Sequence, residues 1–165
     1  MIRPAKESDI PAIHSLLREL AEYEKLAHAC IATEDLLRKH LFGSPEDRAA
    51  EAIIAELDGQ AGGGGGGAVG YALFFKSFST FLARPGLYLE DIYVQPQHRN
   101  KGLGKSMLRH LAQLAVQRNY GRVEWCVLDW NTPSINFYKS LGAFPMDEWT
   151  TYRLTGEALQ KFAQK

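Results

Sequence analysis

The strand, helix and strand in the middle of the chain are the feature that most restricts its fold. An apolar strand is expected over 87–94, and a second over 123–128. Between them, residues 102–119 carry apolar side chains at helical spacing, on one stripe of a helix. A strand, helix and strand in this order form a crossover within one sheet. The chain is therefore expected to be an α/β protein with this crossover near its centre.

The flanking segments are expected to complete a mixed layer of strands and helices. Ser8 or Asp9 precedes one helical pattern and Thr33 precedes a second, and all three are residue types that favour helix starts. The second helix is expected to stop at Gly43 and Pro45. A short helix is expected to open at Thr132 and to end at Gly142. Apolar, aromatic and β-branched runs predict further strands at Ile2, 52–55, 69–75 and 144–154.

Six consecutive glycines, Gly62–Gly67, stand between the expected strands 52–55 and 69–75. Glycine-rich segments behave as flexible connectors, so the run is expected to join two antiparallel strands. A phosphate-binding loop is a less favoured interpretation, because no strand-to-helix junction and no lysine accompany the run.

Size, charge and residue types exclude several classes of protein. The 165 residues suit a single domain, 1–165, and 19 basic against 19 acidic residues give no net charge that would favour nucleic acid or an anionic membrane. No apolar run approaches the ~18 residues of a membrane-spanning helix. Two cysteines and scattered histidines predict neither a disulfide framework nor a metal site. A cytoplasmic protein is expected.

The junction between the central strand and helix, 94–106, is the segment most suggestive of chemistry. Free N–H groups at a helix start favour an anion, and glycines there allow a ligand to approach the backbone closely. Arg99, Lys101, Lys105 and Arg109 add positive charge to the same end of the helix. A phosphate-bearing cofactor is one interpretation. A solvated basic helix start with glycines used for packing is the other.

Two common phosphate motifs are absent from this junction. The P-loop pattern needs a glycine five positions before Gly104, where Arg99 stands. The dinucleotide pattern needs a glycine three positions after Gly104, where Met107 stands. Neither a nucleotide hydrolase nor a dinucleotide-binding enzyme is therefore expected.

The pattern Arg99-x-x-Gly102-x-Gly104 matches the pyrophosphate-binding signature of the GNAT superfamily of N-acetyltransferases. The chain further resembles the spermidine/spermine (diamine) acetyltransferase subfamily over most of its length outside the glycine run. The segments that carry this resemblance are 2–5, 19–25, 88–94, 129–131, 133–139 and 141–143.

The resemblance implies a GNAT fold, in which a mixed, mostly antiparallel sheet of about six to seven strands is flanked by about four helices. A splayed pair of parallel strands in that fold binds acetyl-CoA, the acetyl donor. A homodimer is also implied, with the C-terminal strands contributing to its interface. Residues expected to contact acetyl-CoA are Ile92, Tyr93, Val94, Arg99, Asn100, Lys101, Gly102, Leu103, Gly104, Lys105, Asn131, Thr132, Pro133 and Ser134.

Acetyl transfer to an amine requires a base, because a primary amine arrives as ammonium with a pKa near ~10.4. Glu90 is the candidate base, acting through water, although a regular strand would also be able to point this residue at solvent. By resemblance, Tyr138 is the general acid that protonates the departing thiolate; without the resemblance, core packing would be its commoner role. A covalent route through Cys126 is not favoured, since no histidine adjoins it.

The resemblance also assigns the amine channel to Tyr23, Glu24, Glu90, Glu124, Trp125 and Cys126. Ser79-Thr80 stands where the polyamine branch carries Asp-Pro, and it resembles the thialysine acetyltransferase branch. The expected function is acetyl-CoA-dependent N-acetylation of thialysine, a diamine or a polyamine by direct attack in a ternary complex. A non-catalytic sensor of acetyl-CoA or polyamine, or a protein lysine acetyltransferase, is the alternative.

Overall fold

The computed structural model describes residues 1–57 and 67–164. The expected glycine connector lies outside these residues except for Gly67. The chain divides into two compact units, Met1–Cys126 and Val127–Lys165, and each is described by itself below.

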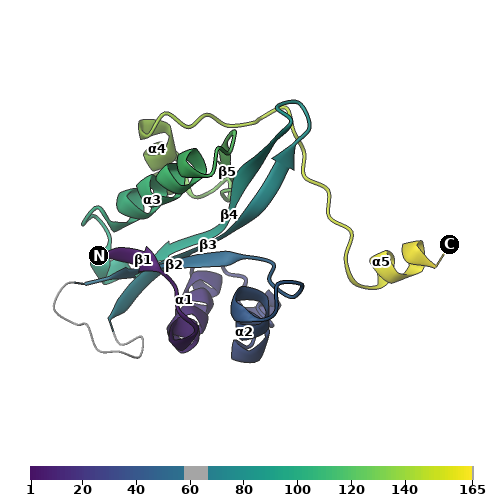
Figure 1. Ribbon diagram of the computed structural model, residues 1–165, viewed down its shortest axis with the longest axis horizontal. Coiled ribbons are helices and arrows are strands. Elements are labelled where there is room, and N and C mark those ends of the chain that lie inside the picture. The colour runs from purple at the N-terminus through teal and green to yellow at the C-terminus, as the bar shows by residue number, and fades with distance from the viewer. Residues whose placement is uncertain (58–66, 165) are drawn as a thin grey trace. The chain divides into compact units, whose positions relative to one another are not determined.

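The first unit contains one sheet of five strands in the order β1-β2-β3-β4-β5 (Figure 1). Neighbours from β1 to β4 are antiparallel, whereas β5 is parallel to β4. The helix α3 (Leu103–Gln117) joins these parallel strands, which confirms the expected crossover. The strands are β1 Ile2–Pro4, β2 Glu51–Glu56, β3 Ala68–Ser79, β4 Arg84–Val94 and β5 Val123–Trp125.

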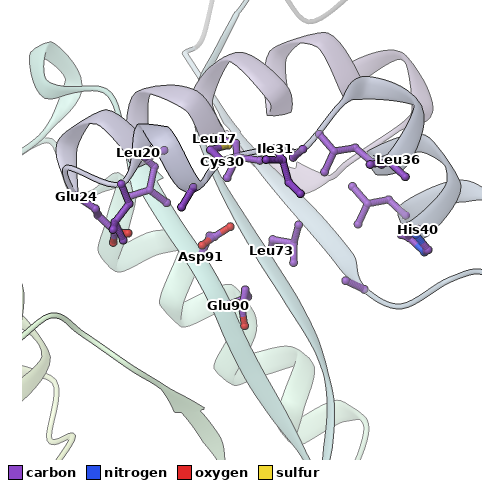
Figure 2. Close-up of a pocket in the computed structure, with 17 residues that line it drawn as sticks. Leu17, Leu20, Glu24, Cys30, Ile31, Leu36, His40, Leu73, Glu90 and Asp91 are labelled. Carbon is purple, nitrogen blue, oxygen red and sulfur yellow. The ribbon is translucent and has the colours of Figure 1, made fainter. Parts of the chain in front are cut away.

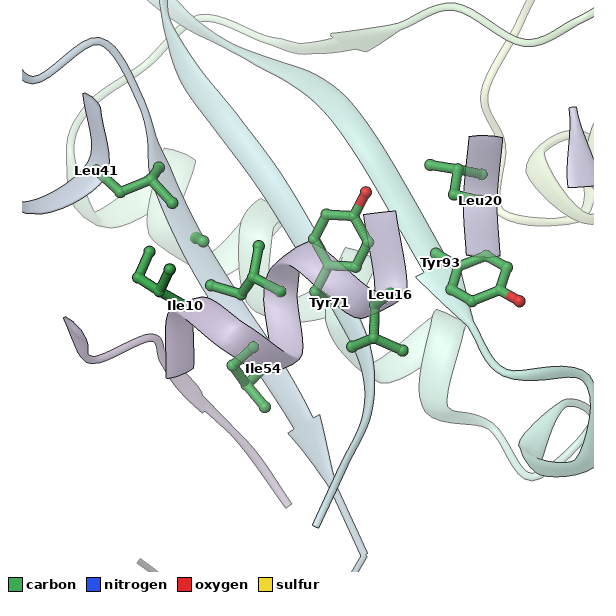
Figure 3. Close-up of a cluster of buried hydrophobic side chains, with 9 residues drawn as sticks. Ile10, Leu16, Leu20, Leu41, Ile54, Tyr71 and Tyr93 are labelled. Carbon is green, nitrogen blue, oxygen red and sulfur yellow. The ribbon is translucent and has the colours of Figure 1, made fainter. Parts of the chain in front are cut away.

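Helices cover both faces of this sheet (Figure 1). On one face, α1 (Ile10–Tyr23) and α2 (Glu34–Phe42) pack over a core formed by Ile54, Tyr71 and neighbouring apolar side chains (Figure 3). On the other face, α3 buries Met107, Leu108, Leu111 and Ala115. Complete burial of an aliphatic side chain contributes about 1.5–3 kcal/mol, so these two apolar layers hold β4 and the start of α3 in place.

Local signals at α2 act as expected. The Thr33 hydroxyl accepts a hydrogen bond from the Leu36 N–H at 3.3 Å, and Gly43 is the residue at which the helix ends. Both features satisfy backbone groups that the helix itself leaves without partners. These residues therefore fix the length of α2 by local chemistry.

Asp9 differs from the expected helix start. It immediately precedes α1, but its carboxylate makes no capping hydrogen bond to that helix. Instead, Asp9 Oδ2 accepts from the Lys6 N–H at 2.7 Å and from Arg3 Nη1 at 2.6 Å, and Arg3 Nη2 donates to Asp9 Oδ1 at 2.9 Å. Arg3 also pairs with Glu56 at 2.5 Å, so this ion pair joins β1, the start of α1 and the end of β2.

The second unit contains α4 (Thr132–Ser140) and α5 (Gly156–Ala163). The strands expected over 144–154 are not present, and the first unit's second parallel strand ends at Trp125 rather than at residue 128. The described residues therefore hold five strands and five α-helices, and the expected six to seven strands are not confirmed. Aromatic residues favour strands only when a neighbouring strand pairs with them. Phe144, Trp149 and Tyr152 are instead strongly exposed.

Candidate active site

A pocket of about 620 Å³ lies in the first unit, between α1, α2 and the strands β3 and β4. Its wall is largely aliphatic, with Leu20, Ile31 and Leu73 among the lining residues. Three carboxylates also line it: Glu24, Glu90 and Asp91 (Figure 2). Leu36 and His40 lie at the opposite end from Glu24. The pocket thus combines an acidic side with an apolar body, which suits a small cation attached to a carbon chain.

A β-bulge explains why two successive residues of β4 line one pocket. Leu73 pairs with Asp91 and Phe74 pairs with Leu89, so Glu90 has no opposite residue on β3. In a regular strand, successive side chains point to opposite faces, and Glu90 and Asp91 would be separated. A bulge inserts one extra residue and re-aims the side chains around it. The predicted base Glu90 is exposed, and the pocket receives Asp91 as well.

Burial alters the acidity of two of these carboxyl groups. Desolvation raises the pKa of Asp91 to about 6, against an opposing hydrogen bond from the Tyr71 hydroxyl to Asp91 Oδ2 at 3.2 Å. Desolvation also raises the pKa of Glu24, which stands at the end of α1. A charged carboxylate in such surroundings is stabilised by a nearby cation. The acidic side of the pocket therefore favours a cationic ligand.

Arg99 connects the end of β4 to the end of α1. Its Nε donates to the Val94 carbonyl at 2.9 Å, and its guanidinium carbon lies 4.8 Å from the centroid of the Tyr23 ring and 5.5 Å from that of Tyr93. The Tyr93 hydroxyl in turn donates to Glu19 Oε2 at 3.2 Å. Arg99 thus holds the predicted cofactor loop against the helix that carries Tyr23 and Glu24.

The start of α3 has the geometry of an anion site. Asn100 and Gly102 adopt left-handed backbone conformations with φ of 60° and 79°, which turn the chain sharply into the helix. Apart from its chain neighbours and the adjacent backbone of its own helix, a Cβ added at Gly104 would meet no atom of the described chain within 4 Å, so the surface of this first turn is open. The first N–H groups of a helix lack partners within it and attract negative charge. The exposed Lys101 and Lys105 add positive charge, and this set of residues fits a pyrophosphate.

β4 extends beyond its parallel neighbour next to this helix start. β5 pairs with β4 only along Leu87–Leu89, whereas β4 continues to Val94. The edge of β4 along Ile92–Val94 is therefore not paired with β5, and the expected splay of the two strands stays a prediction. Residues 90–94 of β4 therefore include Glu90 and Asp91, which line the pocket, and the segment Ile92–Val94, which is predicted to contact the cofactor arm.

Glu124, Trp125 and Cys126 do not join the carboxylates in this pocket. Glu124 Oε2 accepts from Arg122 Nε at 2.7 Å, and the exposed Cys126 Sγ lies 3.1 Å from the Tyr88 hydroxyl. Tyr23 is the last residue of α1 and packs against the hydrophobic core, but it does not line the cavity. The role of these residues in an amine channel stays a prediction.

Tyr138 and the segment 131–134 belong to the second unit. Tyr138 lies in α4, half-buried, with its ring centroid 5.5 Å from that of Phe137. Asn131 opens α4, and its Oδ1 accepts from the Ser134 N–H at 3.4 Å. Pro133 occupies the first turn, where a missing N–H is tolerated. These contacts give the predicted general acid and the second group of cofactor residues a fixed local framework.

Neither a metal-binding cluster nor a membrane-spanning helix is found in the part of the chain that the structure describes. Across 1–57 and 67–164, no group of three or more histidine, cysteine or acidic residues is arranged to hold a metal ion. In the same ranges, every helix is too short or too polar to cross a membrane.

Comparison with known proteins identifies the family. The sequence profile of the acetyltransferase (GNAT) family matches residues 11–143. The chain belongs to this family. It is 40% identical to thialysine N-epsilon-acetyltransferase of Bos taurus, over 100% of this chain and 98% of the relative, and 34% identical to L-ornithine N5-acetyltransferase NATA1 of Arabidopsis thaliana, over 96% and 86%. The prediction of an N-acetyltransferase of the GNAT family that resembles the thialysine acetyltransferases is therefore confirmed.

A solved structure supports the GNAT fold. An integron cassette protein from the mobile metagenome of Vibrio cholerae superposes with a TM-score of 0.79 at 24% identity, covering 100% of this chain and 98% of that one. At this identity the likeness concerns the fold alone.

Sequence reasoning did not single out Asp91, which lines the pocket, or Tyr71, which donates a hydrogen bond to it. The sequence groups Asp91 with Glu90 and the carboxylates at the end of the first helix as side chains that could attract a cation or could simply be solvated, and it places Tyr71 only in an apolar strand. Strict alternation along β4 argues against Asp91 sharing a face with Glu90, and no pattern in the sequence reveals the bulge. The one sequence feature that could have pointed to Asp91 is its position beside Glu90, because two adjacent carboxylates are unusual in an apolar strand.

Proposed function

We propose that this GNAT enzyme transfers the acetyl group of acetyl-CoA to a primary amine of a small cationic substrate, as one N-acetyltransferase domain. The observation that carries the proposal is the continuity of β4, which lines an acidic pocket with Glu90 and Asp91 and then leads into the anion-binding start of α3. One strand thus connects the proposed amine site with the proposed acetyl-CoA site. Acetyl-CoA dependence is also what GNAT membership implies.

The proposed acetyl-CoA residues form three groups. Bound acetyl-CoA supplies the activated thioester. The backbone of Ile92–Val94, on the edge of β4 that does not pair with β5, would align its arm, and the basic helix start at 99–105 would bind its pyrophosphate. The segment 131–134 would add contacts from the second unit. The open surface at Gly104 supports this assignment, because a close approach of ligand to backbone needs the missing side chain.

Two residues are proposed to move protons. Glu90 would accept the proton of the substrate ammonium through a water molecule, and its exposure at the pocket supports access by water. The amine nitrogen then bonds to the acetyl carbon as the carbon–sulfur bond breaks. Tyr138 would donate its phenolic proton to the departing sulfur. No covalent intermediate on the enzyme is required, so the proposed reaction proceeds by direct attack in a ternary complex.

The substrate class is proposed from the relatives and from Ser79. The relatives named above act, by their names, on thialysine and L-ornithine, which supports an amino-acid amine over a polyamine. Ser79 is buried, and its hydroxyl accepts from Arg122 Nη1 at 3.1 Å and from the Leu82 N–H at 3.3 Å. Unlike the aspartate at this place in the polyamine branch, Ser79 has no carboxylate that could bind the distal ammonium group of a polyamine. Diamines and polyamines remain the second group of substrates to test.

A homodimer in the cytoplasm is also proposed. Phe144, Trp149 and Tyr152 of the second unit are 79%, 72% and 92% exposed, and aromatic side chains of this size are commonly covered by a partner. Light scattering of the full chain would give twice the monomer mass of 18.5 kDa if the proposal is correct.

The test of function is release of the CoA thiol from acetyl-CoA with a panel of amines. We expect turnover with thialysine or ornithine above that with spermidine or a lysine peptide. Glu90→Gln and Tyr138→Phe are each expected to lower kcat by about 100-fold or more, the usual range for a general base or acid. Acetyl-CoA binding without release for any amine would favour a sensor, and preference for the peptide would favour a protein acetyltransferase.

A further inference from the structure

Asp91 and Tyr71 form a hydrogen-bonded pair that the proposed chemistry does not use. Tyr71 lies on β3 with 0% of its surface exposed, and its hydroxyl donates to Asp91 Oδ2 on β4 at 3.2 Å. Tyr71 pairs with Tyr93, and Leu73 pairs with Asp91, so Tyr71 and Asp91 are diagonal neighbours across the two strands. Figure 3 shows Tyr71 within the core beneath α1, and Figure 2 shows Asp91 at the pocket.

A comparison with Asp9 shows what Asp91 lacks. Asp9 is buried, but two hydrogen bonds from Arg3 neutralise its charge. Asp91 receives the hydroxyl of a neutral tyrosine, and no lysine or arginine is present among the described residues that line its pocket. A carboxylate removed from water without a cation is costly, and the cost falls when a cation binds.

The groups that face Asp91 come from every element around the pocket. Glu90 adjoins it on β4, Glu24 faces it from the end of α1, and Tyr71 from β3. Cys30 and His40 line the same cavity from the segment between α1 and α2 and from α2. Burial raises the pKa of the Tyr71 hydroxyl well above its ordinary value, so it stays a neutral donor. Because the charged groups around Asp91 are carboxylates, an ammonium ion is the complementary ligand.

We propose that Asp91 binds the substrate ammonium in this pocket and that Tyr71 is a positioning residue that holds the Asp91 carboxylate for it. This assignment deepens the proposed function and rests on it. Glu90, exposed on the same bulge, is left free to take the proton through water. Binding and deprotonation of the amine are thus divided between adjacent carboxylates.

Tyr71→Phe is the decisive variant, because it removes one hydroxyl and keeps the ring in the core. The Tyr71 hydrogen bond opposes the effect of burial on the pKa of Asp91, so its loss raises that pKa further. The acid limb of kcat/KM should move upward by about one pH unit. KM for the amine should then rise about tenfold at about pH 5 and only about twofold at about pH 7, with kcat almost unchanged. Tyr120→Phe is the matched control, because this tyrosine lies just after α3, the helix on the other face of the sheet from the pocket, and it should leave both unchanged.

Asp91→Asn tests the site without touching the core tyrosine. It should raise KM for the amine about 100-fold, and calorimetry should show the same loss of amine affinity. An unchanged acid limb and unchanged KM in Tyr71→Phe would overturn the positioning role, and unchanged amine affinity in Asp91→Asn would overturn the binding site.

The two proposals fail in different ways. If the wild-type protein binds the amine but releases no thiol, the proposed function fails, and the calorimetric loss in Asp91→Asn still supports the ammonium site. If the wild-type protein turns over and Asp91→Asn matches it in KM, only the ammonium site fails. Absence of both amine binding and turnover in the wild-type protein would overturn both.

Discussion

Arg3→Met is expected to destabilise this small enzyme more than the removal of any single exposed charge. The Asp9 side chain is 2% exposed, and Arg3 binds it through two hydrogen bonds of 2.6 and 2.9 Å. After the substitution, the Lys6 N–H at 2.7 Å would be its remaining donor among the contacts described above. Removing one partner of a buried ion pair costs about 3–5 kcal/mol, because the other charge stays buried without compensation.

Arg118→Met is the matched control. Arg118 also binds a carboxylate through two nitrogens, at 2.5 and 2.7 Å from Glu51, but the two side chains are 34% and 51% exposed. Solvent screens such a pair, so its loss should cost only about 0.2–1 kcal/mol. Urea unfolding followed by far-ultraviolet circular dichroism would measure the free energy of unfolding of both variants against the wild-type protein.

The pH dependence separates the Arg3–Asp9 contact from a simple packing effect. The hydrogen bond from Arg3 lowers the pKa of Asp9 in the folded protein, so its stabilisation is present above the ordinary carboxyl pKa and is lost as pH falls through the folded value. In Arg3→Met the hydrogen bond from Arg3 is absent, so the pKa of Asp9 lies higher than in the wild-type protein. The difference in stability between the two proteins should therefore be largest above about pH 5 and should narrow as pH falls below about 4, toward the folded pKa of Asp9. A constant difference over this range, or a loss no larger than that of Arg118→Met, would refute the reasoning.

Two further predictions concern the helix starts. Gly104→Ala should raise the free energy of unfolding by about 0.5–1 kcal/mol, because the added Cβ meets open space, but it should also raise the Kd for acetyl-CoA. Gly104→Val should weaken acetyl-CoA binding further. Equal Kd values for the wild-type protein and both variants in calorimetry would contradict the proposed cofactor site. Thr33→Ala should lower the free energy of unfolding by about 1 kcal/mol through loss of the hydrogen bond from the Leu36 N–H, whereas Thr33→Ser should retain most of it in the same urea assay.

Much of the fold could be predicted because its signals are local. The apolar stripe of α3, the cap at Thr33 and the stop at Gly43 depend on residues within a few positions of one another. The Arg99-x-x-Gly102-x-Gly104 junction is equally local, and it led to the GNAT family that the comparisons show. The strands expected over 144–154 failed for the opposite reason, since a strand requires a partner that the segment itself does not specify.

The sequence alone determined the crossover, the glycine-containing helix start and Glu90 as a candidate base, because helix spacing and motif spacing are properties of neighbouring residues. Only the tertiary structure decided that Asp91 shares a pocket with Glu90 and that Tyr71 donates to it. The register between β3 and β4 creates the bulge at Glu90, and that register depends on the packing of strands and helices far apart in the chain.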